Sequence, residues 1–244
     1  MRVIAKLDVK PPYVVKPVHF EGLRKIGEPA ELARRYYEQG ADEILYVDIV
    51  ASLYCREILF DQIRSASEHV FVPFAAGGGI RSIEDISRLF HCGADKVALN
   101  TEAVQRDPDI IDQAARMFGS QAVMLNVEAK HWGASWECYT DCGRERSGRD
   151  VIEWVREAQQ RGAGEILVQS VDRDGRRRGF DVELIEQVKT AVSVPIIAAS
   201  GAGSLEDIVR MAERARPDAV AVSSVLHYGV CSISDIKTAL KGMG

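Results

Sequence analysis

Two short stretches of this sequence each end an apolar run with a single carboxylate. "LNVEAK" (residues 125–130) presents Glu128, and "AKLDVK" (residues 5–10) presents Asp8. A buried strand that stops at one acidic residue delivers that group to a surface, where it can donate or accept a proton. Two such groups over one substrate can divide acid and base roles if their surroundings separate their pKa values. The alternative is that Glu128 is only the polar end of a strand.

The elements that must position these carboxylates repeat along the chain. Short runs of Val, Ile, Leu and Ala alternate with amphipathic stretches that carry apolar residues at helical spacing. The runs predict strands at residues 2–9, 43–49, 70–76, 96–100, 122–128, 165–170, 194–200 and 219–224. Eight β-then-α units in 244 residues predict an α/β fold, a (βα)8 TIM barrel forming one domain over residues 1–244.

The two halves of the chain resemble each other. "GADEIL" at 40–45 matches "GAGEIL" at 162–167, and "GGGIRSIEDI" at 77–86 matches "ASGAGSLEDI" at 199–208, both at an offset of 122 residues. "ADKVALNT" at 94–101 resembles "PDAVAVSS" at 217–224. Parallel α/β units always share some residues, but matches in one order at nearly one offset indicate duplication. We therefore expect two (βα)4 half-barrel repeats, about 1–120 and 121–244, with Asp8 and Glu128 facing each other.

Glycine-rich turns follow the third and seventh predicted strands, at the barrel end that carries chemistry. Glycines let a backbone approach a ligand closely, and a helix that begins there offers unpaired N–H groups to an anion. The alternative is that these turns only permit tight loops, because Ser82 and Ser204 open capping boxes. Two related turns favour a substrate with a phosphate at each end. The candidate binding residues are Gly78, Gly79, Asn100, Thr101, Gly201, Gly203, Ser223 and Ser224, with Asp174 and Gly175 of "DRDG".

A second set of charges is expected at the opposite end of the barrel. Alternate strand residues face the same side, so counting back by twos identifies the other inward positions. The positions at the strand starts are Arg2, Glu43, Lys96 and Glu165. Buried ion pairs are weak evidence for stability, so a gate or a docking point for a partner explains a ring of two cations and two anions better. The alternative is four ordinary charges at exposed strand starts.

Composition excludes several classes of protein. A net charge of −5 argues against the broad basic surface that a nucleic-acid-binding protein needs. No apolar run in the sequence is long enough to span a membrane. Five cysteines in a chain without a signal peptide are expected to be reduced, and the location to be cytoplasmic. Cys138 and Cys142 have no partners that would complete a zinc site, so we expect no metal and no cofactor. The arginines at 176–178 fit a solvated loop or anion binding equally well.

These motifs together resemble the cyclase subunit of imidazole glycerol phosphate synthase, the HisF-type barrel of histidine biosynthesis. "LDVK", "GGGIRS", "GADKV", "FGSQAV", "GAGEIL", "DRDG" and "SVLHYG" stand in family order over nearly the whole chain. The resemblance implies a two-component glutamine amidotransferase. Ammonia from a glutaminase docked on the barrel's N-terminal face would pass the ring and meet a bisphosphate ribonucleotide. Asp8 matches one catalytic aspartate, Glu128 occupies the position of the second, and Lys16 matches the lysine of the first loop.

The chain departs from the family pattern near this site. Glu128 replaces an aspartate, Asn126 replaces a small residue, and Lys6 replaces an uncharged residue. In the loop "KPPYVVKP", prolines stand where the family has glycines. Arg176 replaces a threonine, and Ser200 replaces a glycine of the second phosphate-binding turn. Three functions therefore stay open: the histidine-pathway cyclase, a HisF-like paralogue that delivers ammonia for amidination of a nucleotide-linked or surface-polysaccharide sugar, and a non-catalytic ammonia conduit. A single-chain sugar-phosphate isomerase is disfavoured because it would not need the bottom ring.

Overall fold

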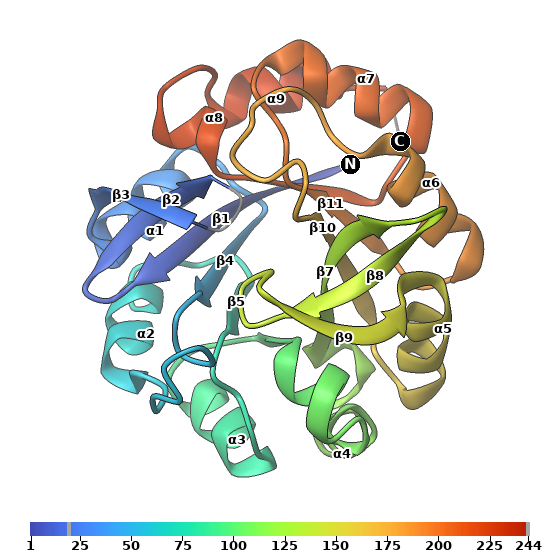
Figure 1. The fold of residues 1–244 in the computed structure, drawn as a ribbon. Helices are drawn as coiled ribbons and strands as arrows, with labels where there is room; N and C mark the ends of the chain where they lie inside the picture. The colour runs from blue at the N-terminus through green and yellow to red at the C-terminus, as the bar shows by residue number, and fades with distance from the viewer. Residues whose placement is uncertain (19–20, 243–244) are drawn as a thin grey trace.

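Eight parallel strands close into a barrel in the computed structural model, which describes residues 1–18 and 21–242 (Figure 1). Their order around the barrel is β1, β4, β5, β6, β7, β10, β11, β12, and β12 pairs with β1. This arrangement confirms the predicted (βα)8 TIM barrel. The strands are β1 Arg2–Lys10, β4 Glu43–Asp48, β5 Phe74–Gly77, β6 Lys96–Leu99, β7 Val123–Trp132, β10 Glu165–Ser170, β11 Ile196–Ala199 and β12 Ala219–Val222.

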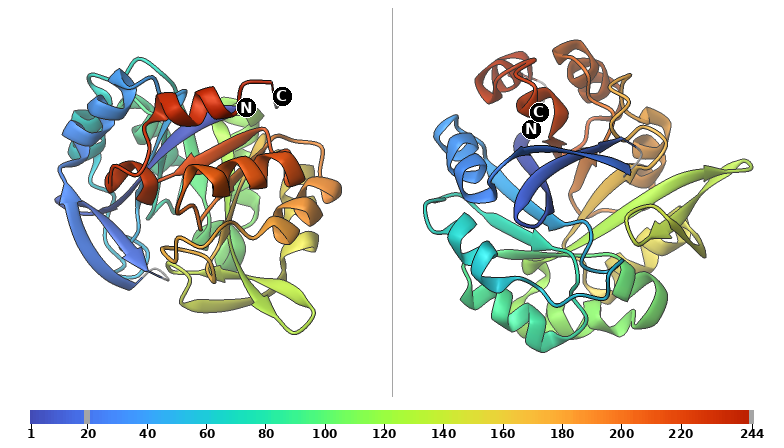
Figure 2. Two further views of the ribbon diagram at one scale, coloured as in Figure 1. Left: turned by 90° about the horizontal axis from the view of Figure 1, so that it is seen from above. Right: turned by 60° about the vertical axis from the view of Figure 1, so that its left-hand side comes forward.

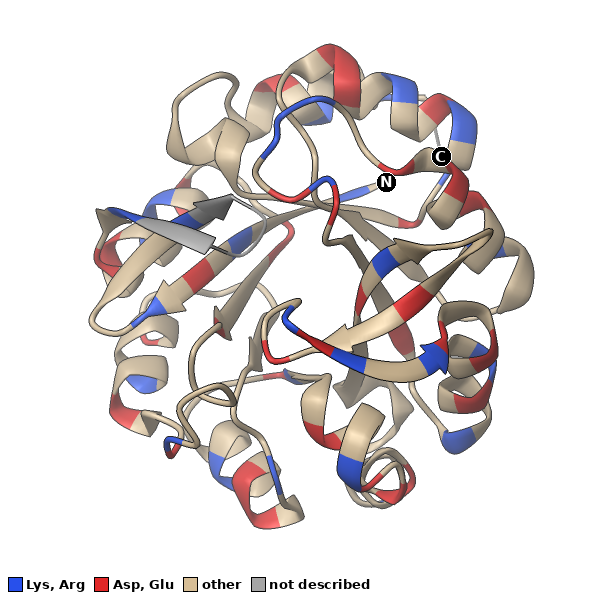
Figure 3. Ribbon diagram, in the orientation of Figure 1, with Lys and Arg blue, Asp and Glu red and all other residues tan. Residues whose placement is uncertain are grey.

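Helices surround the barrel on its outside (Figures 1 and 2). Each strand leads into a helix because the amphipathic stretches bury one face against the sheet. They are α1 Pro29–Glu38, α2 Phe60–Ser67, α3 Ile83–His91, α4 Asp109–Phe118, α5 Val151–Arg161, α6 Val182–Ala191, α7 Leu205–Ala215, α8 Ser224–His227 and α9 Ile233–Ala239, with short turns η1 Glu102–Arg106 and η2 Ser120–Ala122. Acidic and basic residues alternate along these helices (Figure 3).

The third strand begins four residues later than the sequence predicts. Pro73 lacks an N–H and so cannot donate a hydrogen bond to a neighbouring strand. Its carbonyl oxygen accepts a hydrogen bond from Ile44 N at 3.0 Å, and β5 begins at the next residue, Phe74. Phe71 lies just before it with 79% of its surface exposed. The apolar run therefore contains a surface segment as well as a strand.

Two antiparallel hairpins, which the sequence did not predict, project from the barrel. After β1 the chain forms β2 Tyr13–Val18 and β3 Glu21–Gly27; an extended β7 pairs with β8 Ser135–Thr140, which pairs with β9 Glu145–Asp150. Figure 2 shows both projecting from the barrel. Each follows the strand that carries a candidate catalytic carboxylate.

The two halves also share local geometry. Ser82 and Ser204 cap α3 and α7 with φ, ψ of −148°, 166° and −147°, 170°, and each hydroxyl accepts from the N–H three residues on. The Asp85 and Asp207 carboxylates each accept a hydrogen bond from the backbone N–H four residues before them. These matches support the expected half-barrel repeats, which stay a prediction.

Apolar side chains fill two separate regions because successive strand residues point to opposite faces. One region lies between the strands and the helices and includes Val3, Ala5, Leu7 and Trp154. The other lies inside the barrel and includes Ile4, Leu45, Ala98, Met124, Leu167 and Ile197. Among the residues that the structure describes, no helix is long and apolar enough to cross a membrane.

Trp154→Ala tests the outer region. Trp154 in α5 is 1% exposed, so truncation leaves a large cavity and should cost about 3–5 kcal/mol of unfolding free energy. Trp132, which is 54% exposed at the end of β7, is the matched control, and Trp132→Ala should cost below about 1 kcal/mol. Urea unfolding measures both. Equal effects would contradict the placement of Trp154 in the core.

Candidate active site

Asp8 sits at the centre of a buried charge cluster inside the barrel. It shares the inward face of β1 with Lys6, two residues before it, because side chains on a strand alternate. The Lys6 ammonium donates to Asp8 Oδ1, and the Lys16 ammonium donates to Oδ2 at 3.1 Å. Lys16 comes from the β1–β2 hairpin and also donates to Asp174 Oδ1 at 3.3 Å. Two cations and two carboxylates, all at most 5% exposed, balance one another here.

The cluster changes the ionisation of its members. Burial by itself would raise the pKa of Asp8, but the Lys6 and Lys16 ammonium groups outweigh it and hold that pKa well below its ordinary value. Burial would lower the pKa of Lys16, yet the charges of Asp174 and Asp8 raise it above its ordinary value. Asp8 is therefore a carboxylate at neutral pH.

Glu128 lies in a different environment. It lies within β7, close to the turn between β8 and β9, where the Gly143 N–H donates to its Oε2 at 2.7 Å. Burial raises the pKa of Glu128 to about 7, and that N–H and Lys6 only partly oppose the rise. Below it, Gln169 Nε2 donates to Asn126 Oδ1 at 2.7 Å. Glu128 is thus partly protonated near neutral pH, whereas Asp8 is not.

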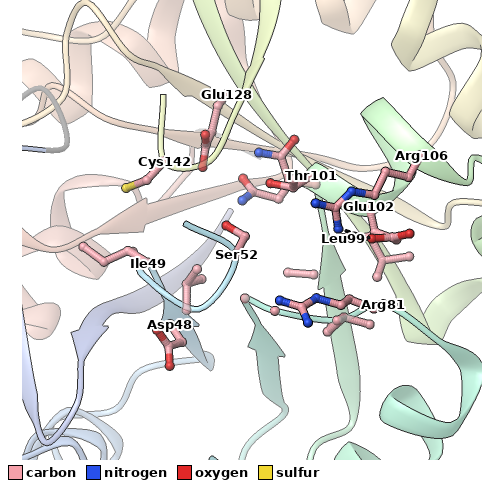
Figure 4. A pocket seen from close by; sticks show the side chains of 17 residues that line it. Asp48, Ile49, Ser52, Arg81, Leu99, Thr101, Glu102, Arg106, Glu128 and Cys142 are labelled. Carbon is pink, nitrogen blue, oxygen red and sulfur yellow. Dashed lines mark hydrogen bonds and ion pairs between the residues drawn. The ribbon is translucent and has the colours of Figure 1, made fainter. Parts of the chain in front are cut away.

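A first cavity contains the glycine turn after β5. Gly78 and Gly79 have φ of +95° and +76°, and a Cβ on Gly78 would lie 2.1 Å from the Asp48 carbonyl oxygen, so only glycine fits there. Asn100, Thr101 and Glu128 also line this cavity. Figure 4 shows Glu128 and Cys142 on one side of it and Arg81 and Arg106 on the other. An anion held by the turn would lie in the same cavity as the Glu128 carboxyl group.

A second cavity contains the turn after β11. Its lining includes Lys6, Lys16, Asp174, Gly175, Ser200, Gly201, Ser223 and Ser224. Gly201 has φ of +107°, and Ser200 also adopts a positive φ, of +71°. Gly203 is not among the lining residues; its backbone packs on Arg177, where a Cβ would lie 2.2 Å from the carbonyl oxygen. The exposed arginines at 176–178 do not line it either.

The four charges at the opposite end of the barrel form a closed ring. Lys96 Nζ lies 2.8 Å from both Glu43 Oε2 and Glu165 Oε2, and Arg2 pairs with the same two carboxylates. Glu43 is buried, whereas the Arg2 side chain is 36% exposed. Burial raises the pKa of Glu43 despite Lys96 and Arg2. The role of this four-residue ring as an ammonia gate stays a prediction.

Sequence reasoning missed the turn that covers the first cavity. Asp141 N donates to Thr101 Oγ1 at 3.2 Å, and the Cys142 side chain lines the cavity beside Glu128. The sequence signal for this turn is "TDCGRE" (residues 140–145), in which Cys142 stands out only as one half of a C-x3-C pair. The described cysteines are free thiols, and the described residues contain no group of three or more His, Cys, Asp or Glu that could hold a metal.

Glu128→Gln should change how stability depends on pH. The pKa of Glu128 is raised from 4.5 to about 7 in the folded chain, so the unfolded chain loses this proton first as pH rises. The wild type should therefore lose, relative to the variant, on the order of 3 kcal/mol between about pH 4.5 and 7, and no more above that. Urea unfolding at a series of pH values measures the difference. A difference that is constant with pH would contradict the raised pKa.

Comparison with known proteins places this architecture in a family. Residues 2–232 match the family model described as "Histidine biosynthesis protein". The chain is 51% identical over 208 residues to the imidazole glycerol phosphate synthase subunit HisF of Legionella pneumophila, covering 85% of this chain and 98% of that one. The HisF subunits of Dehalococcoides mccartyi and Bifidobacterium longum are 44% and 46% identical over 243 and 250 residues, covering 100% of this chain and 96% and 97% of theirs. The chain belongs to the histidine biosynthesis protein family.

Proposed function

We propose that this chain is the cyclase subunit of an imidazole glycerol phosphate synthase. It would use ammonia to convert a bisphosphate ribonucleotide into imidazole glycerol phosphate and an aminoimidazole carboxamide ribotide, as a lyase of histidine biosynthesis. The observation that carries the proposal is the match to HisF subunits over the whole chain at 44% and 46% identity. Two glycine-turn cavities beside a pair of buried carboxylates agree with it.

The substrate would lie across the top of the barrel, with one phosphate in each cavity. Gly78 and Gly79 would bring backbone N–H groups to the first phosphate, near the start of α3, where the helix dipole favours an anion. Gly201, Ser223 and Ser224 would hold the second, with Lys16 beside them. Asn100, Thr101, Asp174 and Gly175 complete the proposed binding set, and Gly203 would act only through backbone packing.

Asp8 and Glu128 would act on the bond-making part of the substrate between the two phosphates. Asp8 is covered by Lys6 and Lys16 and lines neither cavity, so a substrate would reach it only if these side chains move. Glu128 lines the first cavity directly. The reaction adds ammonia, closes a ring and cleaves a bond, and each of these steps moves protons that a carboxyl group can carry.

The N-terminal face of the barrel would bind a glutaminase. Phe71 and Met117, which are 79% and 65% exposed, lie before β5 and near the end of α4, on the same face as the charge ring. Ammonia released there would pass Arg2, Glu43, Lys96 and Glu165 and then cross the apolar side chains inside the barrel. We place this complex in the cytoplasm.

Two other functions follow from the departures in the sequence. A paralogue that serves sugar amidination would explain Lys6, Asn126 and Glu128, and a non-catalytic conduit would need only the ring. The comparisons support neither, because the relatives reported above are all named as subunits of imidazole glycerol phosphate synthase.

Turnover of the bisphosphate ribonucleotide with ammonium salts, without a partner, tests the proposed reaction. Asp8→Asn and Glu128→Gln should each lower the rate by about 10²–10⁴-fold, because each removes a group that carries or stabilises charge during proton transfer. Asp61→Asn is the matched control, since its side chain is 98% exposed on α2, and it should not change the rate. Unchanged turnover in both site variants would favour the conduit, and no turnover in the wild type would refute the proposed reaction.

Lys96→Ala tests the ring in the complex with a glutaminase. Without Lys96, Glu43 and Glu165 keep only Arg2, so the ring opens on one side. The yield of product per glutamine hydrolysed should fall severalfold, while turnover with ammonium salts stays unchanged. Arg34→Ala removes an exposed ion pair with Glu38 on α1 and is the control for both measurements. Equal yields in the wild type and the Lys96 variant would contradict a role in ammonia passage.

A further inference from the structure

Lys6 is a buried cation that the proposed reaction leaves without a role. It is 4% exposed and points into the barrel from β1, in register with Leu45 of the neighbouring strand. Its ammonium group pairs with Asp8 and also lines the second cavity. A buried ion pair at this position contributes little to stability compared with an apolar side chain. Packing therefore does not explain why a lysine stands there.

Lys6 is the dedicated partner of Asp8. The Lys16 ammonium is shared, because it lies 3.1 Å from Asp8 Oδ2 and 3.3 Å from Asp174 Oδ1. The Lys6 ammonium has only Asp8 as a carboxylate partner among the described residues, and it occupies the other oxygen. With both oxygens held by cations, Asp8 can bind a proton only by giving up an ion pair in a dry environment.

Glu128 contrasts with Asp8 in each respect. One of its oxygens accepts the Gly143 N–H, and the described residues give the other, Oε1, no hydrogen bond. It lines the first cavity, so a ligand there would reach it directly. The charged and titratable groups around the two carboxyl groups come from several elements: Lys6, Lys16, Asp141, Cys142, Asp174 and His227. Of the cations among them, Lys6 influences both carboxyl groups.

We propose that Lys6 is a positioning residue that keeps Asp8 ionised and so leaves proton exchange with the substrate to Glu128. This inference rests on the proposed function. In each transfer the O–H bond of the Glu128 carboxyl group breaks, and its proton forms a new bond with a substrate oxygen or nitrogen. The Glu128 carboxylate then regains a proton from the substrate amine or from water. Asp8 stays an anion throughout and offers a fixed negative charge to the reacting centre.

Carbon-13 NMR of the labelled carboxyl groups in the intact chain tests this division directly. Between about pH 4 and pH 9, one glutamate carboxyl group should titrate near pH 7, and Glu128→Gln should remove that signal. Asp8, assigned with Asp8→Asn, should not titrate in this range. Titration of Asp8 near neutral pH in the wild type would overturn the proposal, and this measurement needs no variant at Lys6.

Lys6→Met and Lys6→Arg form the matched pair of variants. Without the Lys6 charge, the titration midpoint of Glu128 should rise, and the signal of Asp8 should begin to change at the acidic end of this pH range. Lys6→Arg keeps the charge and should restore both titrations towards the wild-type behaviour. Titrations that are the same in the methionine variant and the wild type would overturn the role of Lys6.

The pH dependence of turnover, at a fixed concentration of free ammonia, gives the functional readout. The wild type should lose activity as pH rises through about 7, because Glu128 then no longer holds a proton to donate. Lys6→Met should move this limb to higher pH, because Lys6 lowers the pKa of Glu128. An unmoved limb would overturn the proposal. If the wild type shows no turnover, the proposed function fails, while the NMR titrations still decide the role of Lys6.

Discussion

The alternation of side chains along eight parallel strands is the constraint on which the rest of the structure depends. In a closed barrel every second residue of each strand points into one narrow lumen, so residues far apart in sequence become neighbours in layers. The lowest layer is the ring of Arg2, Glu43, Lys96 and Glu165. Apolar residues such as Leu45 and Leu167 follow, and polar and charged groups lie above them. One rule of strand geometry thus places the charge ring at one end of the lumen and the buried Asp8 cluster at the other.

Charge is balanced differently at the two ends of this lumen. At the bottom, a partly exposed Arg2 and a Lys96 bridge two carboxylates, and water can screen part of the interaction. At the top, Lys6, Asp8, Lys16 and Asp174 are almost completely buried, so each charge depends on its direct partner.

The two hairpins complete the site in ways that the barrel itself could not. The hairpin after β1 carries Lys16 back over Asp8, and the β8–β9 turn brings the Gly143 N–H to Glu128. Together with Lys6 from β1 itself, Lys16 gives Asp8 two cationic partners, whereas Glu128 meets a neutral donor. This difference in partners, added to burial, is what separates the pKa values of two groups at equivalent strand ends.

The sequence by itself determined the barrel, the two glycine turns and the inward positions of both carboxylates and the ring. These follow from strand alternation, helical periodicity and the φ requirements of glycine, all of which act over a few residues. Only the tertiary structure decided that Lys16 folds back onto Asp8, that Glu128 lines a cavity, and that Gly203 does not. Those outcomes depend on where the hairpins fold back and on which strands become neighbours, and no local pattern encodes such long-range approaches.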